Sequence, residues 1–162
     1  MIFERWILIG VILISLLMLL FFIPRDKIRD AFVLFLFLQV VTWPAGLFAV
    51  EKGWIKYPVQ LFPNTNHLNR SSFTFEFFLF PILAIIFSLY FPKKSKWLIV
   101  TLYIILFTGI FTGIEVLLER FTDLVKYIKW KWYWTFISVM VSLLINHIYY
   151  SWFKNEFIKG EN

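Results

Sequence analysis

Five long apolar segments constrain the fold of this chain more than any other feature of its sequence. They span residues 6–23, 31–50, 73–91, 97–118 and 132–153, so each is 18 to 22 residues long. At a rise of about 1.5 Å per residue, an α-helix of this length reaches roughly 27–33 Å and matches a bilayer core of about 30 Å. Because backbone groups in lipid must be satisfied within the segment, we predict an all-α, polytopic integral membrane protein built as a five-helix transmembrane bundle.

The composition of the chain agrees with this prediction. Of the 162 residues, 60% are hydrophobic, whereas soluble domains are about 45–50% apolar. The first segment follows Glu4 and Arg5, and no small-residue cleavage site comes after it, so we expect a retained helix rather than a signal peptide. We therefore predict a single transmembrane domain over residues 1–162 and no soluble domain.

Several kinds of chemistry are excluded by the residues that the chain lacks. It has no cysteine, which removes disulfide frameworks, Cys-ligated zinc and thiol nucleophiles, and its two histidines are too few for a His-rich metal site. The net charge of +6 comes from Lys and Arg in the links between the segments. That placement is typical of membrane orientation and of contact with anionic lipid. We expect no nucleic acid partner and no cofactor. The expected partner is the lipid bilayer, and a membrane protein partner or a homo-oligomer is an open alternative.

The basic residues also bear on orientation. Eight lie on each side of a five-span topology, so their number alone decides nothing. The links at 24–30 and 92–96 are very short and hold clustered Lys and Arg, and short links are where the positive-inside rule applies best. We predict an outside N-terminus and a cytoplasmic C-terminus.

The link at 119–131 has helical periodicity of its own. Leu117, Phe121, Leu124 and Ile128 form one apolar stripe, and charged residues lie elsewhere around the helix. This pattern predicts an amphipathic extension between the fourth and fifth helices, either beyond the membrane or bent onto its surface.

Polar residues follow one face of each of the last two segments. The spacings of 7, 4, 3 and 4 in the fourth segment, and of 3, 4 and 4 in the fifth, are helical. The residues are Thr101, Thr108, Thr112, Glu115 and Glu119, then Thr135, Ser138, Ser142 and Asn146. Two interpretations remain open: the stripes serve helix packing, as Gly109 and Gly113 favour, or they line a wet cleft.

Four glutamates fall on the same side of the predicted membrane. Glu51 ends the second segment, Glu76 opens the third, and Glu115 and Glu119 close the fourth. Gathered carboxylates can bind a cation or pass a proton, and oxygen ligands suit Ca²⁺, Mg²⁺ or Na⁺ better than zinc. Alternatively, glutamates at helix ends simply reach water and pair with nearby Lys and Arg. The candidate ligand-binding residues, which would also hold any metal, are Glu115, Glu119, Glu76, Glu51 and Thr112.

Several ordered strings carry a resemblance to a known family. They are QVVTW at 39–43, VE at 50–51 followed by Gly53, YP at 57–58, SFTFE at 72–76, TGIE at 112–115 and WKWYWT at 130–135. This pattern resembles a family of small multi-pass membrane proteins from Bacillus and Clostridium relatives. The family has no assigned activity, so the resemblance implies a bacterial plasma membrane location and transfers no site.

The sequence leaves three function classes open. The first is a transport-related or sensory protein that binds an ion or small molecule at the glutamates near the external face. The second is a structural or assembly protein with no ligand. The third is a membrane-embedded lipid enzyme, for which Glu115 and Glu119 would supply acid–base chemistry but nothing supplies a nucleophile. We assign no catalytic residue and expect no enzyme.

Overall fold

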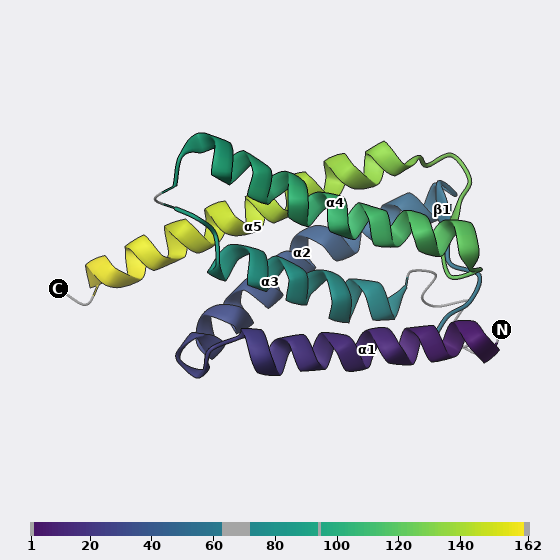
Figure 1. Ribbon diagram of the computed structural model, residues 1–162, viewed down its shortest axis with the longest axis horizontal. Helices are drawn as coiled ribbons and strands as arrows, with labels where there is room; N and C mark the ends of the chain where they lie inside the picture. Colours follow the sequence, from purple (N-terminus) through teal and green to yellow (C-terminus); the bar gives the residue numbers. More distant parts are fainter. Residues whose placement is uncertain (1, 63–71, 94, 161–162) are drawn as a thin grey trace.

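The computed structural model describes residues 2–62, 72–93 and 95–160 of the chain. Lys94, from the basic third link, lies outside the described residues. The elements are α1 (Ile2–Phe22), η1 (Arg25–Lys27), α2 (Ile28–Glu51), β1 (Ile55–Lys56), η3 (Phe75–Leu79), α3 (Phe80–Leu89), α4 (Trp97–Phe121), β2 (Lys126–Tyr127) and α5 (Trp132–Gly160). Helices run alternately up and down one bundle (Figure 1).

The predicted membrane character of the chain is confirmed in its coarse form. Among the described residues, four helices are long and apolar enough to cross a membrane, and this indicates a membrane location. They are Phe3–Phe22, Arg25–Glu51, Trp97–Phe121 and Trp132–Asn155. Four of the five predicted segments coincide with these helices.

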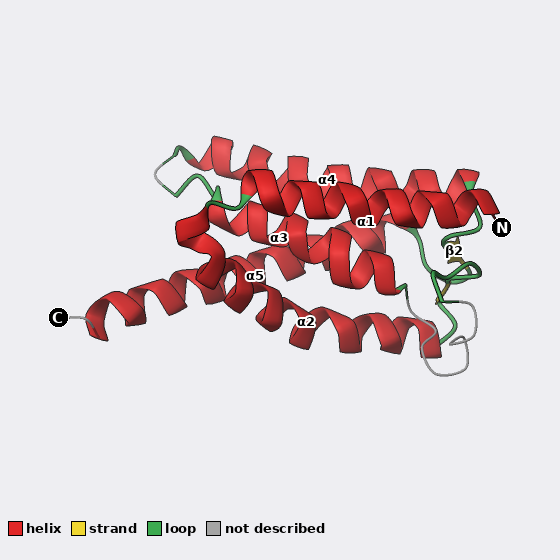
Figure 2. Ribbon diagram, turned by 90° about the horizontal axis from the view of Figure 1, so that it is seen from below, coloured by secondary structure: helices red, strands yellow, loops and turns green. Residues whose placement is uncertain are grey.

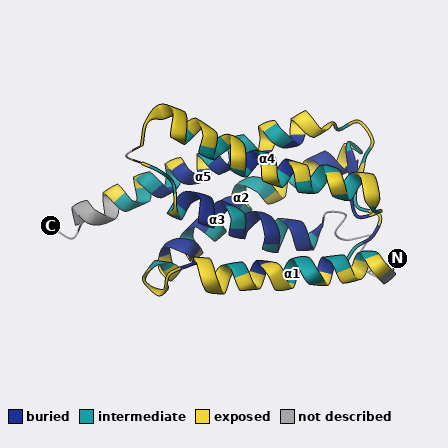
Figure 3. Ribbon diagram, in the orientation of Figure 1, coloured by how far each residue is buried: buried dark blue, intermediate teal, exposed yellow. Residues whose placement is uncertain are grey.

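The remaining predicted segment, 73–91, forms the buried centre of the bundle (Figure 3). Its apolar helix, Phe75–Leu89, is shorter than the other four, so a fifth crossing is not established by length. The helix opens with the π-helical turn η3, in which the Phe80 N–H donates to the Phe75 carbonyl. Pro81 follows directly, and proline cannot donate the bond that a regular helix needs there. From Phe80 to Ser88 nearly every side chain of α3 is buried, as expected for a helix that is apolar all round.

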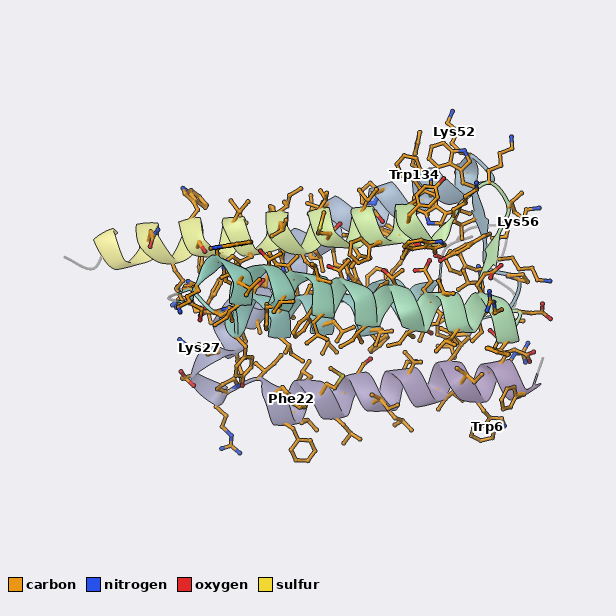
Figure 4. All side chains as sticks on the ribbon, turned by 45° about the horizontal axis from the view of Figure 1, so that its top comes forward. Trp6, Phe22, Lys27, Lys52, Lys56 and Trp134 are labelled. Carbon is orange, nitrogen blue, oxygen red and sulfur yellow. The ribbon has the colours of Figure 1, made fainter. Side chains whose placement is uncertain are left out.

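One end of the bundle carries the two short strands. The N-terminus, the end of α2, the start of η3, the end of α4 and the start of α5 meet there (Figures 1 and 2), and we call it the cap end. Polar and aromatic side chains mark both ends of the bundle. Trp6, Trp134, Lys52 and Lys56 lie at the cap end, whereas Lys27 lies at the opposite end (Figure 4).

The predicted amphipathic extension is wrong. Helix α4 ends at Phe121, and β2 then pairs antiparallel with β1, matching Ile55 with Tyr127 and Lys56 with Lys126. The physical reason lies in Leu124 and Val125, which are both 1% exposed and pack in one core cluster with Ile55. Both residues precede β2 and bury two consecutive side chains in the core, whereas the predicted helical stripe would turn only Leu124 inward.

Candidate functional site

Two of the predicted glutamates, Glu76 and Glu115, line one cavity at the cap end. The cavity has a volume of about 170 Å³ and is bounded by α2, η3, α3, α4, α5 and the two strand-bearing links. Its polar wall is made of the two carboxylates and a set of hydroxyls, Tyr57, Thr42, Thr135, Ser138 and Ser142. Three of the four residues of the predicted α5 stripe therefore line a cavity, and Asn146 does not; of the predicted α4 stripe, only Glu115 lines it.

Glu115 is held by hydroxyl donors. Its Oε1 accepts a hydrogen bond of 2.6 Å from the Tyr127 hydroxyl and one of 2.8 Å from Thr135 Oγ1. Thr135 is itself fixed, because the Trp130 indole N–H donates to its oxygen at 2.8 Å. Both bonds fall on Oε1, so Oε2 remains available to a molecule in the cavity.

The strand-bearing links place these donors over Glu115. The Trp54 carbonyl accepts from three consecutive backbone N–H groups, those of Ile128, Lys129 and Trp130, at 2.9, 3.1 and 3.2 Å. The Trp54 and Trp130 rings also stack, with centroids 6.0 Å apart. Together with the β1–β2 pairing, these contacts fix Tyr127 and Trp130 relative to α4. Such support is what keeps a binding constellation in place.

Glu76 lines the same cavity from the π-helical turn η3. The Gln39 side-chain amide donates to the Glu76 backbone carbonyl at 2.8 Å and ties the turn to α2. The Glu76 carboxylate lies directly against Gly46 of α2, where an added Cβ would be 2.5 Å from Oε1. Glycine at 46 therefore provides the space that this carboxylate occupies. Irregular π-helical turns are frequent at functional sites.

The hydroxyl of Tyr57 is affected by the charges of both carboxylates. Burial, followed by the charges of Glu115 and Glu76, raises the pKa of the Tyr57 hydroxyl well above its usual range. Burial and the neighbouring Glu115 likewise raise the pKa of Tyr127. Both phenols therefore keep their protons at neutral pH and remain hydrogen-bond donors beside the carboxylates.

The other predicted site residues lie elsewhere. Glu51 is exposed at the end of α2, and Glu119 is half-buried one turn beyond Glu115. Thr112 is 5% exposed inside the bundle, and its hydroxyl has no hydrogen-bond partner among the described residues. None of the three lines the cavity. The structure thus brings together Glu76 and Glu115 and leaves Glu51, Glu119 and Thr112 outside the lining.

Sequence reasoning missed the aromatic part of the site. Tyr57, Tyr127 and Trp130 lie in the links, and their approach to Glu115 depends on pairing between links that are distant along the chain. The tyrosines have no local spacing relative to Glu115 that would have revealed them.

A buried carboxylate, Asp30 at the start of α2, lies at the opposite end of the bundle. Its Oδ2 accepts a hydrogen bond of 2.8 Å from the Tyr150 hydroxyl and an ion pair of 2.9 Å from Lys154, both on α5. The Asp30 side chain is 7% exposed. The contacts join the first residues of α2 to the last turns of α5.

Metal binding finds little support in the arrangement of ligands. Within residues 2–62, 72–93 and 95–160, no group of three or more His, Cys, Asp or Glu side chains is placed to hold a metal ion. Ca²⁺ takes six to eight oxygen ligands and Mg²⁺ needs octahedral geometry. Two carboxylates and scattered hydroxyls are a sparse set for either ion.

Comparison with known proteins adds no chemistry to the site. The chain matches no protein-family model, and no curated protein and no solved structure is similar to it. The resemblance to small membrane proteins of Bacillus and Clostridium relatives stays a prediction.

Proposed function

We propose that the protein is a membrane-embedded binding protein that captures a small cation, an ion or a small molecule, between Glu76 and Glu115. The observation that carries the proposal is the environment of Glu115. It lies within the candidate span Trp97–Phe121, its described partners are the neutral hydroxyls of Tyr127 and Thr135, and it borders a cavity. A carboxylate at membrane depth is costly unless it is paired, so such residues commonly mark ligand or ion sites.

The proposal includes five crossings of the membrane. The short helix Phe75–Leu89 supports this, because it packs between α1, α2 and α5 and connects the cap end to the opposite end. Residues 73–74 extend the helical stretch further toward the cap end. A buried central helix does not need an apolar length equal to that of its lipid-facing neighbours, because protein surrounds it.

The proposed location is a bacterial plasma membrane, with the cap end outside and the C-terminus in the cytoplasm. The basic links at 24–30 and 92–96 support this orientation, because both lie at the end opposite the cap. In this orientation the cavity would take its ligand from the external side. That direction suits a sensory or transport-related protein.

Thermal unfolding of the purified protein with a panel of cations tests the proposal. We expect one class of cation to raise the melting temperature by several degrees, and Glu115→Gln to abolish the shift. Glu119→Gln is the matched control, because Glu119 lies one turn along the same helix and outside the cavity lining. A panel with no shift, or a shift that survives Glu115→Gln, contradicts the proposal.

Assembly with a partner helix is the second candidate function, and Gly109 and Gly113 favour it. A Cβ at either position would meet nothing within 4 Å, so neither glycine serves close packing within the chain. A Gly-xxx-Gly pair on an open helix face suits close approach of another transmembrane helix. If this is their role, Gly113→Leu shifts the protein to a smaller species in sedimentation measurements, and an unchanged species contradicts it.

A further inference from the structure

We infer that the ligand of the cavity is an organic ammonium ion, a small protonated amine with an apolar body, rather than a metal ion. This inference rests on the proposed function, because it names the class of cation that Glu76 and Glu115 would bind. Three properties of the cavity carry it: its charge, its aromatic wall and its volume.

The charge and the hydroxyls fit an ammonium group. Glu115 Oε2 and the Glu76 carboxylate provide negative charge, while Ser138 and Ser142 of α5 add hydroxyl oxygens to the lining. A primary ammonium group has three N–H donors and no acceptor. It therefore needs a charged acceptor and further neutral oxygens, which this wall offers.

Aromatic rings make up much of the remaining wall. The rings that line the cavity belong to Tyr57, Phe75, Phe80, Phe111 and Trp130. The faces of such rings attract organic cations, by about 0.5–2 kcal/mol per well-placed ring, and they also pack against carbon. A hydrated metal ion has no carbon surface to pack against these rings, so the aromatic wall favours a cation that has an apolar body.

The volume of the cavity also favours an organic ammonium ion over a metal ion. One water molecule needs on the order of 10–15 Å³ of such space, whereas the cavity has about 170 Å³. That space is far larger than a dehydrated metal ion requires and is suited to an ion of several carbon atoms. The described residues also hold no cluster of three or more metal-ligating side chains. Size and ligand count therefore both disfavour a metal as the resident cation.

Calorimetric titration of the full chain in lipid nanodiscs tests this inference. The probes are n-butylammonium, its neutral counterpart 1-butanol, and Na⁺, K⁺, Mg²⁺ and Ca²⁺. We expect n-butylammonium to bind at least tenfold more tightly than 1-butanol and than any of the metal ions. Glu115→Gln should weaken n-butylammonium at least tenfold, and Glu119→Gln should leave it unchanged.

The outcomes separate the inference from the proposed function. A metal ion that binds in a Glu115-dependent way while n-butylammonium does not would overturn the inference and leave the proposed function standing. Equal affinity for n-butylammonium and 1-butanol would overturn the inference, because charge would then not be recognised. No binding of any cation would overturn both. The comparison of probes uses the wild-type chain alone, so it does not depend on the folding of a variant.

Discussion

Two carboxylates at opposite ends of the bundle, the buried Asp30 and the half-buried Glu115, have different partners. Asp30 accepts from Tyr150 and forms an ion pair with Lys154, so its charge is neutralised within the chain. Glu115 also accepts from a tyrosine, Tyr127, but its second described partner is the neutral hydroxyl of Thr135. Among the described residues, the same kind of group is thus paired with a cation at one end and hydrogen-bonded by neutral hydroxyls at the other.

This difference separates a structural role from a binding role. The Asp30–Lys154 pair joins α2 to α5. Neither residue lines the cavity that contains Glu76 and Glu115. Glu115 is oriented by fixed donors and faces open space, which leaves the positive partner to an incoming ligand. A charge inside a protein is tolerated when it is paired and hydrogen-bonded. A carboxylate that has no cationic partner within the chain can obtain one by binding a cationic ligand.

The largest expected effect concerns the structural end. Asp30→Ala leaves Lys154 without its carboxylate and the Tyr150 hydroxyl without its acceptor, so we expect a loss of about 3 kcal/mol in the free energy of unfolding. Denaturant unfolding of the purified protein measures it, and the binding of n-butylammonium should persist in the folded fraction. Asp30→Asn combined with Lys154→Met should recover much of the loss, because both charges are then removed. A loss below about 1 kcal/mol would rank this pair with exposed ion pairs and weaken the comparison.

Removing one hydroxyl from the binding end should have a smaller effect. Tyr127→Phe deletes one of the two donors to Glu115 Oε1 and leaves Thr135 in place. We expect the affinity for n-butylammonium to fall about fivefold, which corresponds to roughly 1 kcal/mol for one hydrogen bond. Tyr133→Phe is the control, because Tyr133 is exposed and lies outside the cavity lining. If both variants bind equally well, Tyr127 does not position the carboxylate.

A methyl group at Gly46 should move Glu76 without removing its charge. In Gly46→Ala the new Cβ would overlap Glu76 Oε1, and the end of that flexible side chain must shift. We expect about a threefold loss of affinity, in line with a rotamer cost of roughly 0.5–1.5 kcal/mol. Gly10→Ala is the matched control, because a Cβ there meets nothing within 4 Å. Unchanged affinity in Gly46→Ala would remove Glu76 from the ligand's environment.

The smallest effect is expected at a third carboxylate, Asp123, which is paired but exposed. The Lys126 ammonium lies 2.8 Å from Asp123 and lowers the pKa of that carboxyl, with side chains 53% and 56% exposed. A lowered pKa in the folded state adds stability above the unfolded pKa, and that stability is lost as the pH falls through the folded value. An NMR titration should find the Asp123 pKa below about 3.9, and Lys126→Gln should return it to that value. If Lys126→Gln does not change the pKa, the pair does not form in solution.

The long helices were predictable because each depends on a local run of apolar residues. The predicted segments 31–50 and 97–118 lie within α2 and α4, which extend only a few residues further. The predicted segment 73–91 is helical over residues 73–89, but composition alone does not show the π-helical turn at Phe75–Leu79 or the burial of α3, which distinguish it from the four longer helices. The link at 119–131 failed for a non-local reason, since β2 requires β1 as its partner.

The candidate site was predictable in its charges and not in its geometry. Helical spacing placed Glu115 on a polar stripe, and topology placed Glu76 at the same end. The same two arguments also selected Glu51, Glu119 and Thr112, which do not line the cavity. Sharing a helix end or face does not decide whether side chains converge, because convergence depends on how helices pack and on the donors that the links supply.

Infrared difference spectroscopy on addition of n-butylammonium tests the comparison of the two carboxylates most directly. We expect a carboxylate difference band that loses its Glu115 component in Glu115→Gln and is unchanged in Asp30→Asn, because the ligand meets Glu115 and does not meet Asp30. A band that is the same in Glu115→Gln as in the wild-type chain, or one that is lost in Asp30→Asn alone, would contradict the assignment of the binding role to the cap end.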